Sequence, residues 1–337
     1  MITSLRWLVS VAVGGAIAVC FAQADFYRSI AVGDRTYVVG PSIKLGQYLS
    51  KVKYSPAGNS VVFIEEFVED SYVVERERVA RGQQTSRRLV GRFDIQSGVK
   101  STLFEIQLGE VVMDIDPVGP NGGVICSLVV GKSSGDNLIW KVVYCPVGQG
   151  AKVIKDRIVG RSVSVCGSRT DQKAFVFSCG EGCPTEISFV TNSGQKTQRL
   201  EKMAYQGGAY GSRTSDGDPI ITLQDGAPDY KLLGNYRLSF ATGAALPISE
   251  IPSVGQTEPG MKPKFVFNEV VRSKGDSNLA QNPLIDIVAE STEKSRGKLL
   301  MTQGAIQLIE TEALGRSVIY LSNEGGYYLR EIVQVLK

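Results

Sequence analysis

The sequence predicts an all-β fold made from a repeated unit of about 50 residues. Three segments share one order of residue types, an apolar strand end followed by a polar turn that closes on glycine: Phe93–Gly98 (FDIQSG), Phe189–Gly194 (FVTNSG) and Leu238–Gly243 (LSFATG). With weaker copies that end at Gly148 and Gly297, the turn glycines lie 50, 46, 49 and 54 residues apart. A period of this length that carries several short strands is typical of a β-propeller. We therefore expect one propeller of about six four-stranded blades, with about seven as the alternative.

Each expected blade starts with an alternating strand, continues through a turn rich in Gly, Pro, Asn, Asp or Ser, and enters an apolar, buried strand. The expected first strands of the six blades are Tyr48–Tyr54, Val111–Asp116, Ser162–Val165, Gly208–Ser212, Phe265–Val271 and Ile306–Thr311. The buried second strands that follow them, in the same order, are Ser60–Ile64, Val124–Val130, Ala174–Phe177, Ile220–Leu223, Leu284–Ala289 and Ser317–Leu321. The blades then cover residues 47–108, 110–156, 160–202, 207–251, 264–303 and 305–337.

The last of these blades is one strand short. Asp34–Gly40 has the pattern of a short strand, and we expect Pro41 to end it because proline cannot donate a hydrogen bond to a neighbouring strand. This N-terminal strand is expected to complete the last blade and to join the two ends of the chain in one sheet. Residues 25–337 then form a single propeller domain, in which Pro252–Pro263 is a loop between blades.

The first blade carries the clearest resemblance to a known family. Tyr54–Phe63 (YSPAGNSVVF) and the turn at Phe93–Gly98 resemble the two halves of the TolB-like, WD40-like propeller repeat, although Ala57 stands where that repeat usually has aspartate. The resemblance implies a propeller of about six or seven blades and a protein-binding role. It implies no catalytic residue.

The N-terminus has the organisation of a secretory signal peptide. Arg6 is the only charge in the first 24 residues, the run Trp7–Ala24 is uncharged and mostly apolar, and it ends in Ala22-Gln23-Ala24. We expect cleavage after Ala24 and a periplasmic or secreted protein, with residues 1–24 as the signal peptide. The alternative is an uncleaved segment that anchors the chain to a membrane, and this would be the chain's only membrane contact.

Composition excludes several function classes. Lys and Arg number 37 against 34 Asp and Glu, so the net charge of +3 offers no basic surface for nucleic acid. The chain has no histidine, which excludes His-dependent catalytic triads and His-ligated metal sites. We expect no metal and no bound cofactor.

Five cysteines follow the signal segment: Cys126, Cys145, Cys166, Cys179 and Cys183. Cysteines in exported proteins commonly form disulfides, so all five are candidates for such bonds, and the odd number leaves at least one thiol over. Cys126 would lie near Cys145 on an adjacent strand. Cys179 would pair with Cys183, or Cys166 would pair with either of them.

Two groups of charged residues are candidates for a site. Asp114 and Asp116 would share one face of a first strand and could line the centre of the propeller as a catalytic pair, although Asp116-Pro117 also resembles the start of a turn. The long connection Glu65–Arg88 is rich in arginine and could contact a partner, but its mixed charges equally fit a solvated hairpin. Its arginines are Arg76, Arg78, Arg81, Arg87 and Arg88.

The sequence therefore favours a non-enzymatic role. The first hypothesis is an exported propeller that acts as a binding scaffold, with a protein as the expected partner and a glycan as the other candidate. The alternative is a polysaccharide hydrolase or lyase that works without histidine, through carboxylates in the centre of the propeller.

Overall fold

The computed structural model describes residues 26–68, 86–107, 109–214, 216–226, 231–249, 263–271, 284–293 and 297–335. Every regular element in these ranges is a β-strand, so the predicted all-β fold class is confirmed. The part of the chain that the structure describes contains no helix with the length and hydropathy that a membrane span requires. The expected signal peptide, residues 1–24, lies outside the described residues.

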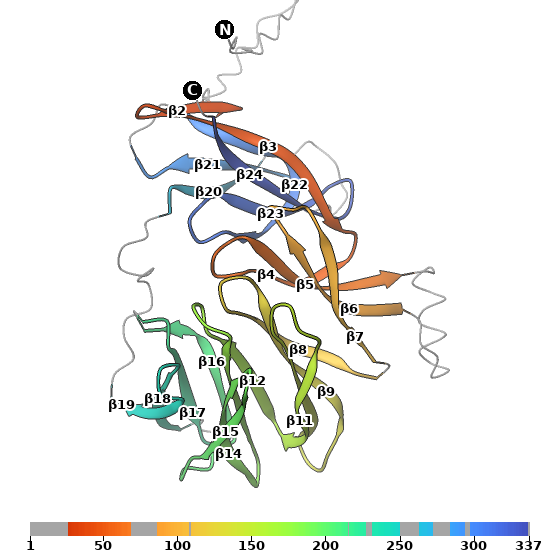
Figure 1. Ribbon diagram of the computed structural model, residues 1–337, viewed down its shortest axis with the longest axis vertical. Helices are drawn as coiled ribbons and strands as arrows, with labels where there is room; N and C mark the ends of the chain where they lie inside the picture. The colour runs from red at the N-terminus through yellow and green to blue at the C-terminus, as the bar shows by residue number, and fades with distance from the viewer. Residues whose placement is uncertain are drawn as a thin grey trace, which may run out of the picture.

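Four antiparallel sheets of four strands each follow one another along the chain, and in each sheet the strands are hydrogen-bonded in chain order (Figure 1). Sheet 1 contains β4 (Leu49–Tyr54), β5 (Ser60–Val68), β6 (Ser86–Asp94) and β7 (Lys100–Ile106). Sheet 2 contains β8 (Val111–Val118), β9 (Gly123–Lys132), β10 (Leu138–Cys145) and β11 (Lys152–Gly160). Sheet 3 contains β12 (Ser162–Gly167), β13 (Lys173–Gly180), β14 (Cys183–Thr191) and β15 (Gly194–Arg199). Sheet 4 contains β16 (Gln206–Arg213), β17 (Pro219–Gln224), β18 (Leu232–Ser239) and β19 (Ala244–Ile248).

The remaining eight strands form one larger sheet, sheet 5, in the order β2-β3-β24-β23-β22-β21-β20, with β1 parallel to β22. Its strands are β1 (Phe26–Tyr27), β2 (Ser29–Val32), β3 (Arg35–Gly46), β20 (Phe265–Val271), β21 (Ile285–Ser291), β22 (Lys298–Thr311), β23 (Ser317–Ser322) and β24 (Tyr327–Val335). The two last blades expected from the sequence are thus joined. The cause is β22, which pairs with β21 along its first part and with β23 along its second part. Gly304, with a φ of +65°, lies at the change of partner.

The N-terminal strand closes the last sheet, as predicted. β3 pairs with β24 from Thr36 opposite Val335 to Gly46 opposite Tyr327, and Figure 1 shows these two strands side by side. The expectation that Pro41 ends this strand was wrong, because β3 continues to Gly46. Pro41 is tolerated because the register with β24 shifts at this point, so its missing N–H is not required in the ladder.

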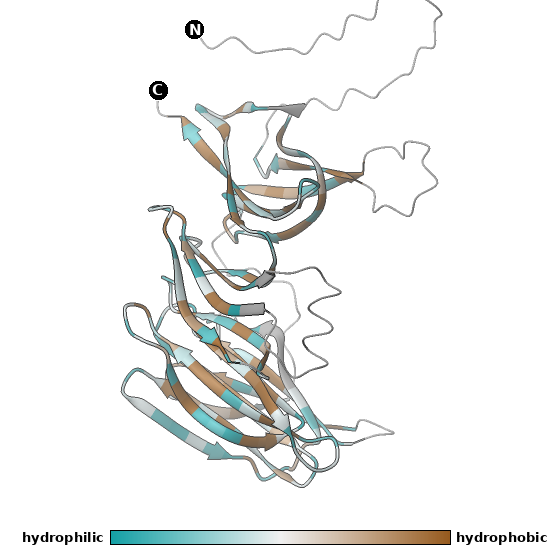
Figure 2. Cartoon of the chain, turned by 90° about the vertical axis from the view of Figure 1, so that its right-hand side faces the viewer, coloured by the Kyte–Doolittle hydropathy of each residue, from teal (hydrophilic) through white to brown (hydrophobic). Residues whose placement is uncertain are grey.

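The apolar core lies between neighbouring sheets, which is how a propeller buries its hydrophobic surface. One buried cluster joins sheets 1 and 2, another joins sheets 2 and 3, a third joins sheets 3 and 4, and a fourth joins sheets 5 and 1. A further cluster fills the curve of sheet 5 itself. Figure 2 shows the corresponding alternation of apolar and polar bands along the strands. The consecutive four-stranded sheets, the cores between them and the shared closing sheet together define a multi-bladed β-propeller.

The five turn glycines that revealed the repeat all adopt positive φ angles: Gly98, Gly148, Gly194, Gly243 and Gly297. Only glycine enters this region without a steric penalty, which is why it recurs there. The first four close the hairpins between the third and fourth strands of sheets 1 to 4. Gly297 instead precedes β22, which explains the longer last step of the repeat.

Candidate functional site

The first strands of sheets 1 to 4, together with β22 of sheet 5, lie next to one another at the centre of the molecule. β22 contacts β4, β4 contacts β8, β8 contacts β12, and β12 contacts β16. Side chains near the ends of these strands can therefore meet although they are far apart in sequence. Five of them do so and are called here the central cluster: Lys53, Asp114, Asp116, Cys166 and Arg213.

Asp116 holds this cluster together. Its Oδ1 accepts a hydrogen bond from Lys53 Nζ at 3.0 Å, and its Oδ2 accepts bonds from the backbone N–H of Gly167 at 2.8 Å and from Arg213 Nη2 at 3.2 Å. The side chain is 15% exposed. One carboxylate on β8 thus links the first strands of sheets 1, 3 and 4, and the charge-assisted bonds make the link strong.

Asp114 lies beside it in a different environment. Its Oδ1 accepts from the N–H of Ile115 at 2.9 Å and its Oδ2 from the N–H of Val165 at 3.4 Å. Burial raises the pKa of the Asp114 carboxyl, the positive charge of Lys53 opposes that rise, and the negative charge of Asp116 adds to it. Both carboxylates of the pair considered from the sequence lie on one first strand, β8. Asp116-Pro117 does not open a turn, because β8 continues to Val118.

The cations of the cluster were not predicted from the sequence. Burial by itself would lower the pKa of Lys53, but Asp116 and Asp114 outweigh it and raise that pKa above its ordinary value. Arg213 Nη2 also donates to Gly167 O and to Cys166 Sγ, both at 3.0 Å. The one available signal is positional: each of these residues, like Asp116, lies a few residues before the first turn of its repeat.

Irregular strand pairing explains why simple alternation could not find them. The register shifts between Ser50 and Lys53 in β4, between Val112 and Asp114 in β8, and between Ala209 and Arg213 in β16. A β-bulge changes the direction in which the next side chains point, and bulges occur often beside functional sites. Strands β4, β8 and β16 are thus irregular directly before a residue that they contribute, whereas β12, which contributes Cys166, pairs regularly with β13.

The five cysteines of the described residues are all free and buried, so the disulfides considered from their spacing are not formed. Cys126 and Cys145 do lie on paired strands, but the register places Cys126 opposite Val143 and Cys145 opposite Val124. Cys179 packs in the core between sheets 3 and 4. Cys183 pairs with Gly180, and neighbouring strand residues point to opposite faces, so Cys183 points away from Cys179.

Cys166, the thiol of the central cluster, is also unsuited to redox chemistry. Burial raises its pKa to about 12, although the charge of Arg213 opposes the rise. A nucleophilic or metal-binding cysteine needs a low pKa and access to solvent. Among the residues that the structure describes, no group of three or more Cys, Asp and Glu side chains is arranged to hold a metal ion.

The arginine-rich connection is described only at its base. Arg76, Arg78 and Arg81 lie outside the described residues, as does the side chain of Arg87. Arg88 is half-buried, and its Nη2 donates to the carbonyl oxygen of Glu110 at 3.3 Å. Arg88 therefore links sheets 1 and 2.

Several exposed apolar side chains lie on one face of the propeller. All first strands run in the same direction, so their starts, together with the turns between second and third strands, form one face, called here the start face. Its large apolar side chains, each about half exposed, are Tyr48, Val111, Met113, Met203 and Leu232. Arg161 lies there too, with its guanidinium 4.2 Å from the centre of the Tyr205 ring, and both side chains bond to Asp136.

Comparison with known proteins yields neither a matching family model nor a matching curated protein sequence. Similar solved structures include the β-propeller domain of the Trilobed protease from Pyrococcus furiosus, with 10% identity over 87% of this chain and 84% of that chain and a TM-score of 0.36. TolB from Acinetobacter baumannii is 12% identical over 75% of this chain and 57% of its own, with a TM-score of 0.33. An oligogalacturonate lyase in complex with manganese is 10% identical over 86% and 78%, with a TM-score of 0.37. A β-propeller domain and TolB are thus among the solved structures to which this chain is similar.

Proposed function

We propose that this chain is an exported binding scaffold of the propeller type that holds a protein partner on its start face. The observation that carries the proposal is the group Tyr48, Val111 and Met113, half-exposed apolar side chains at the starts of the adjacent strands β4 and β8. Exposed apolar side chains on adjacent strands are costly in water, and where they adjoin they commonly mark an interaction site. The signal-peptide pattern of residues 1–24 supports export.

The geometry of the central cluster gives less support to the alternative, a polysaccharide hydrolase or lyase. A catalytic carboxylate must be free to exchange a proton or contact the sugar. Asp116 is instead occupied by Lys53, Arg213 and the backbone of Gly167. Burial raises the pKa of Asp114, as is usual for a general acid. Asp116, which would be the second carboxylate of the catalytic pair, is instead bonded to residues of other blades.

Replacing Met113 by aspartate should reduce capture of the partner at least about tenfold, because a charge at the centre of an apolar interface must lose its hydration on binding. The chain beginning at Asp25 is immobilised, incubated with envelope extract, and the retained proteins are quantified by mass spectrometry. Val99→Asp is the matched control: Val99 is 57% exposed, Met113 is 46% exposed, and Val99 lies in a turn on the opposite face.

One protein retained by the natural chain and by Val99→Asp, but lost with Met113→Asp, is the expected result. Equal loss with both variants, or no reproducibly retained protein, contradicts the proposal. Turnover of a polysaccharide that disappears in Asp114→Asn would favour the enzyme instead.

A further inference from the structure

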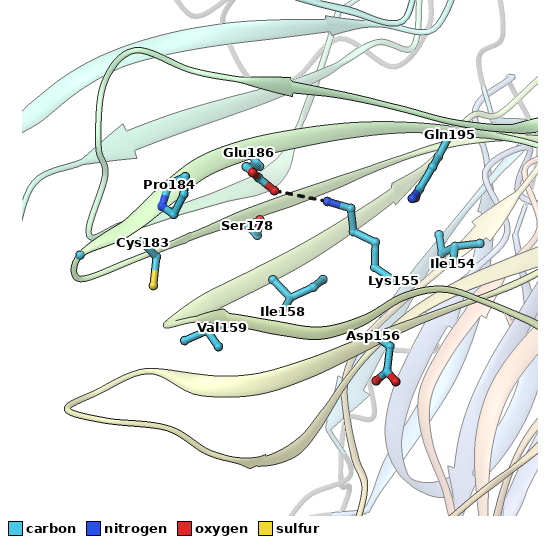
Figure 3. A pocket seen from close by; sticks show the side chains of 11 residues that line it. Ile154, Lys155, Asp156, Ile158, Val159, Ser178, Cys183, Pro184, Glu186 and Gln195 are labelled. Atoms are coloured by element: carbon cyan, nitrogen blue, oxygen red, sulfur yellow. Dashed lines mark ion pairs between the residues drawn. The ribbon is translucent and has the colours of Figure 1, made fainter.

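A pocket of about 540 Å³ lies between the outer strand of sheet 2 and the face of sheet 3 (Figure 3). None of the five residues of the central cluster lines it, and one of its ends reaches the turn between β13 and β14 on the start face. One wall is β11, and the other consists of residues from β13, β14 and β15. Its volume falls within the range of small-molecule sites in proteins.

The wall formed by β11 is apolar because that strand is irregular. Ile154, Ile158 and Val159 line the pocket, and Pro184 lines it from the opposite side. The register with β10 shifts twice here, which leaves Ile154, Asp156 and Arg157 without partners in that ladder. Arg157 has a φ of +54°, a conformation that a non-glycine residue rarely adopts. The two register shifts interrupt the regular alternation of side chains along β11, so the adjacent residues Ile158 and Val159 both line the pocket.

The polar part of the pocket contains a mostly buried lysine that shares its carboxylate partner with a second cation. Lys155 is only 13% exposed, and its Nζ lies 3.5 Å from Glu186 Oε2. The other oxygen of Glu186 accepts a hydrogen bond from Arg199 Nη2 at 3.1 Å. Lys155 and Arg199 therefore share one carboxylate, so Glu186 is only a partial partner for Lys155, which stands next to an apolar wall.

The other charged groups nearby are not paired with Lys155. Asp156 also lines the pocket, but its Oδ1 accepts a hydrogen bond from the N–H of Arg157, and Figure 3 shows its carboxylate pointing away from Lys155. The Arg157 side chain is exposed. Ser178 and Gln195, also on the lining, add a hydroxyl and an amide that can donate to an anion.

We propose that this pocket binds a small carboxylate that carries one compact apolar group. The carboxylate binds Lys155 Nζ, and the apolar group packs against Ile154, Ile158 and Val159. A mostly buried cation gains most from an anionic partner that also keeps water away from the ion pair. A ligand that carries both a carboxylate and an apolar group does this. Glu186 does not lose its charge partner when the ligand binds, because Arg199 remains bound to it.

The test compares acids with neutral amides of the same shape by isothermal titration calorimetry on the chain beginning at Asp25. The probes are 3-phenylpropanoate against 3-phenylpropanamide, and N-acetylglycylphenylalanine against its C-terminal amide. Each acid should bind at least about tenfold more tightly than its amide, because the amide forfeits a charge-assisted hydrogen bond. If 3-phenylpropanoate binds more tightly than the dipeptide, the natural ligand is a free acid. If N-acetylglycylphenylalanine binds more tightly, it is the C-terminus of a peptide.

Lys155→Met should lower the affinity for the acid to that of the amide, whereas Lys152→Met should not change it. Lys152 lies on the same strand, outside the pocket lining, and donates to Gln149. Equal affinity for acid and amide, or no binding of either acid below about 10 mM, would overturn the proposal. This comparison uses the natural chain and so does not depend on whether a variant folds.

Discussion

Asp116→Ala is expected to lower the free energy of unfolding by about 3 kcal/mol. The change removes the one acceptor shared by Lys53, Arg213 and the N–H of Gly167. It leaves Lys53 and Arg213 without this carboxylate and the N–H of Gly167 without its acceptor, where the first strands of four sheets meet; Arg213 keeps its bonds to Gly167 O and Cys166 Sγ. Breaking a buried ion pair from one side costs about 3–5 kcal/mol, and we take the lower end because the Lys53 side chain is 38% exposed. The measurement is equilibrium unfolding in urea, followed by circular dichroism.

Glu290→Ala is the control for this experiment. Glu290 pairs with Lys298 on sheet 5, but the two side chains are 50% and 42% exposed. An exposed ion pair contributes about 1 kcal/mol or less. If Asp116→Ala is no more destabilising than Glu290→Ala, the central cluster does not hold the blades together.

Gly167→Ala is expected to destabilise the protein by about 3 kcal/mol or more, through steric conflict. A methyl group at Gly167 would lie 2.0 Å from the carbonyl oxygen of Pro117 and 2.9 Å from Cγ2 of Val118. Both contacts come from β8, so β12 and β8 would have to separate. That movement would also break the bonds of Gly167 to Asp116 and Arg213. Overpacking of this kind costs about 1–3 kcal/mol, and the lost hydrogen bonds add to it.

The matched control is Gly131→Ala, in β9. A methyl group there would meet only Ile139, at an ordinary distance of 3.6 Å. Alanine also reduces the freedom of the unfolded chain, so this variant should be neutral or slightly more stable. Differential scanning calorimetry of both variants checks the pair, and similar melting temperatures would contradict the close approach of β8 and β12.

The fold was predictable because its signals are local. A glycine that must adopt positive φ, as at Gly98 or Gly243, marks a turn whatever the surrounding sheet does. The closing of sheet 5 by β3 followed from counting strands, since the last repeat lacked one. The fusion of the last two blades was not predictable in this way. The blade boundary predicted at residue 304 falls where β22 changes partner, but the chain passes through Gly304 as one continuous strand.

The candidate site was only half predictable. Asp114 and Asp116 could be placed together because two residues separated by one other on a strand share a face. Lys53 and Arg213 come from other repeats, and each follows a register shift that ordinary alternation does not anticipate. The cysteine spacing correctly suggested neighbouring strands for Cys126 and Cys145. It could not show that these residues stand two positions out of register.

The central claim is that both ends of the chain meet in one sheet of a propeller, and a designed cross-link tests it most directly. Val38 and Val333 are direct partners across β3 and β24, and opposite positions in antiparallel strands have Cα separations that a disulfide can bridge. In Val38→Cys/Val333→Cys, mild oxidation of the folded protein should join the two peptides, as detected by mass spectrometry. The control Val38→Cys/Leu246→Cys, with Leu246 in sheet 4, should remain unlinked. Failure of the first pair to cross-link while its thiols still react with a soluble reagent would contradict the closed sheet.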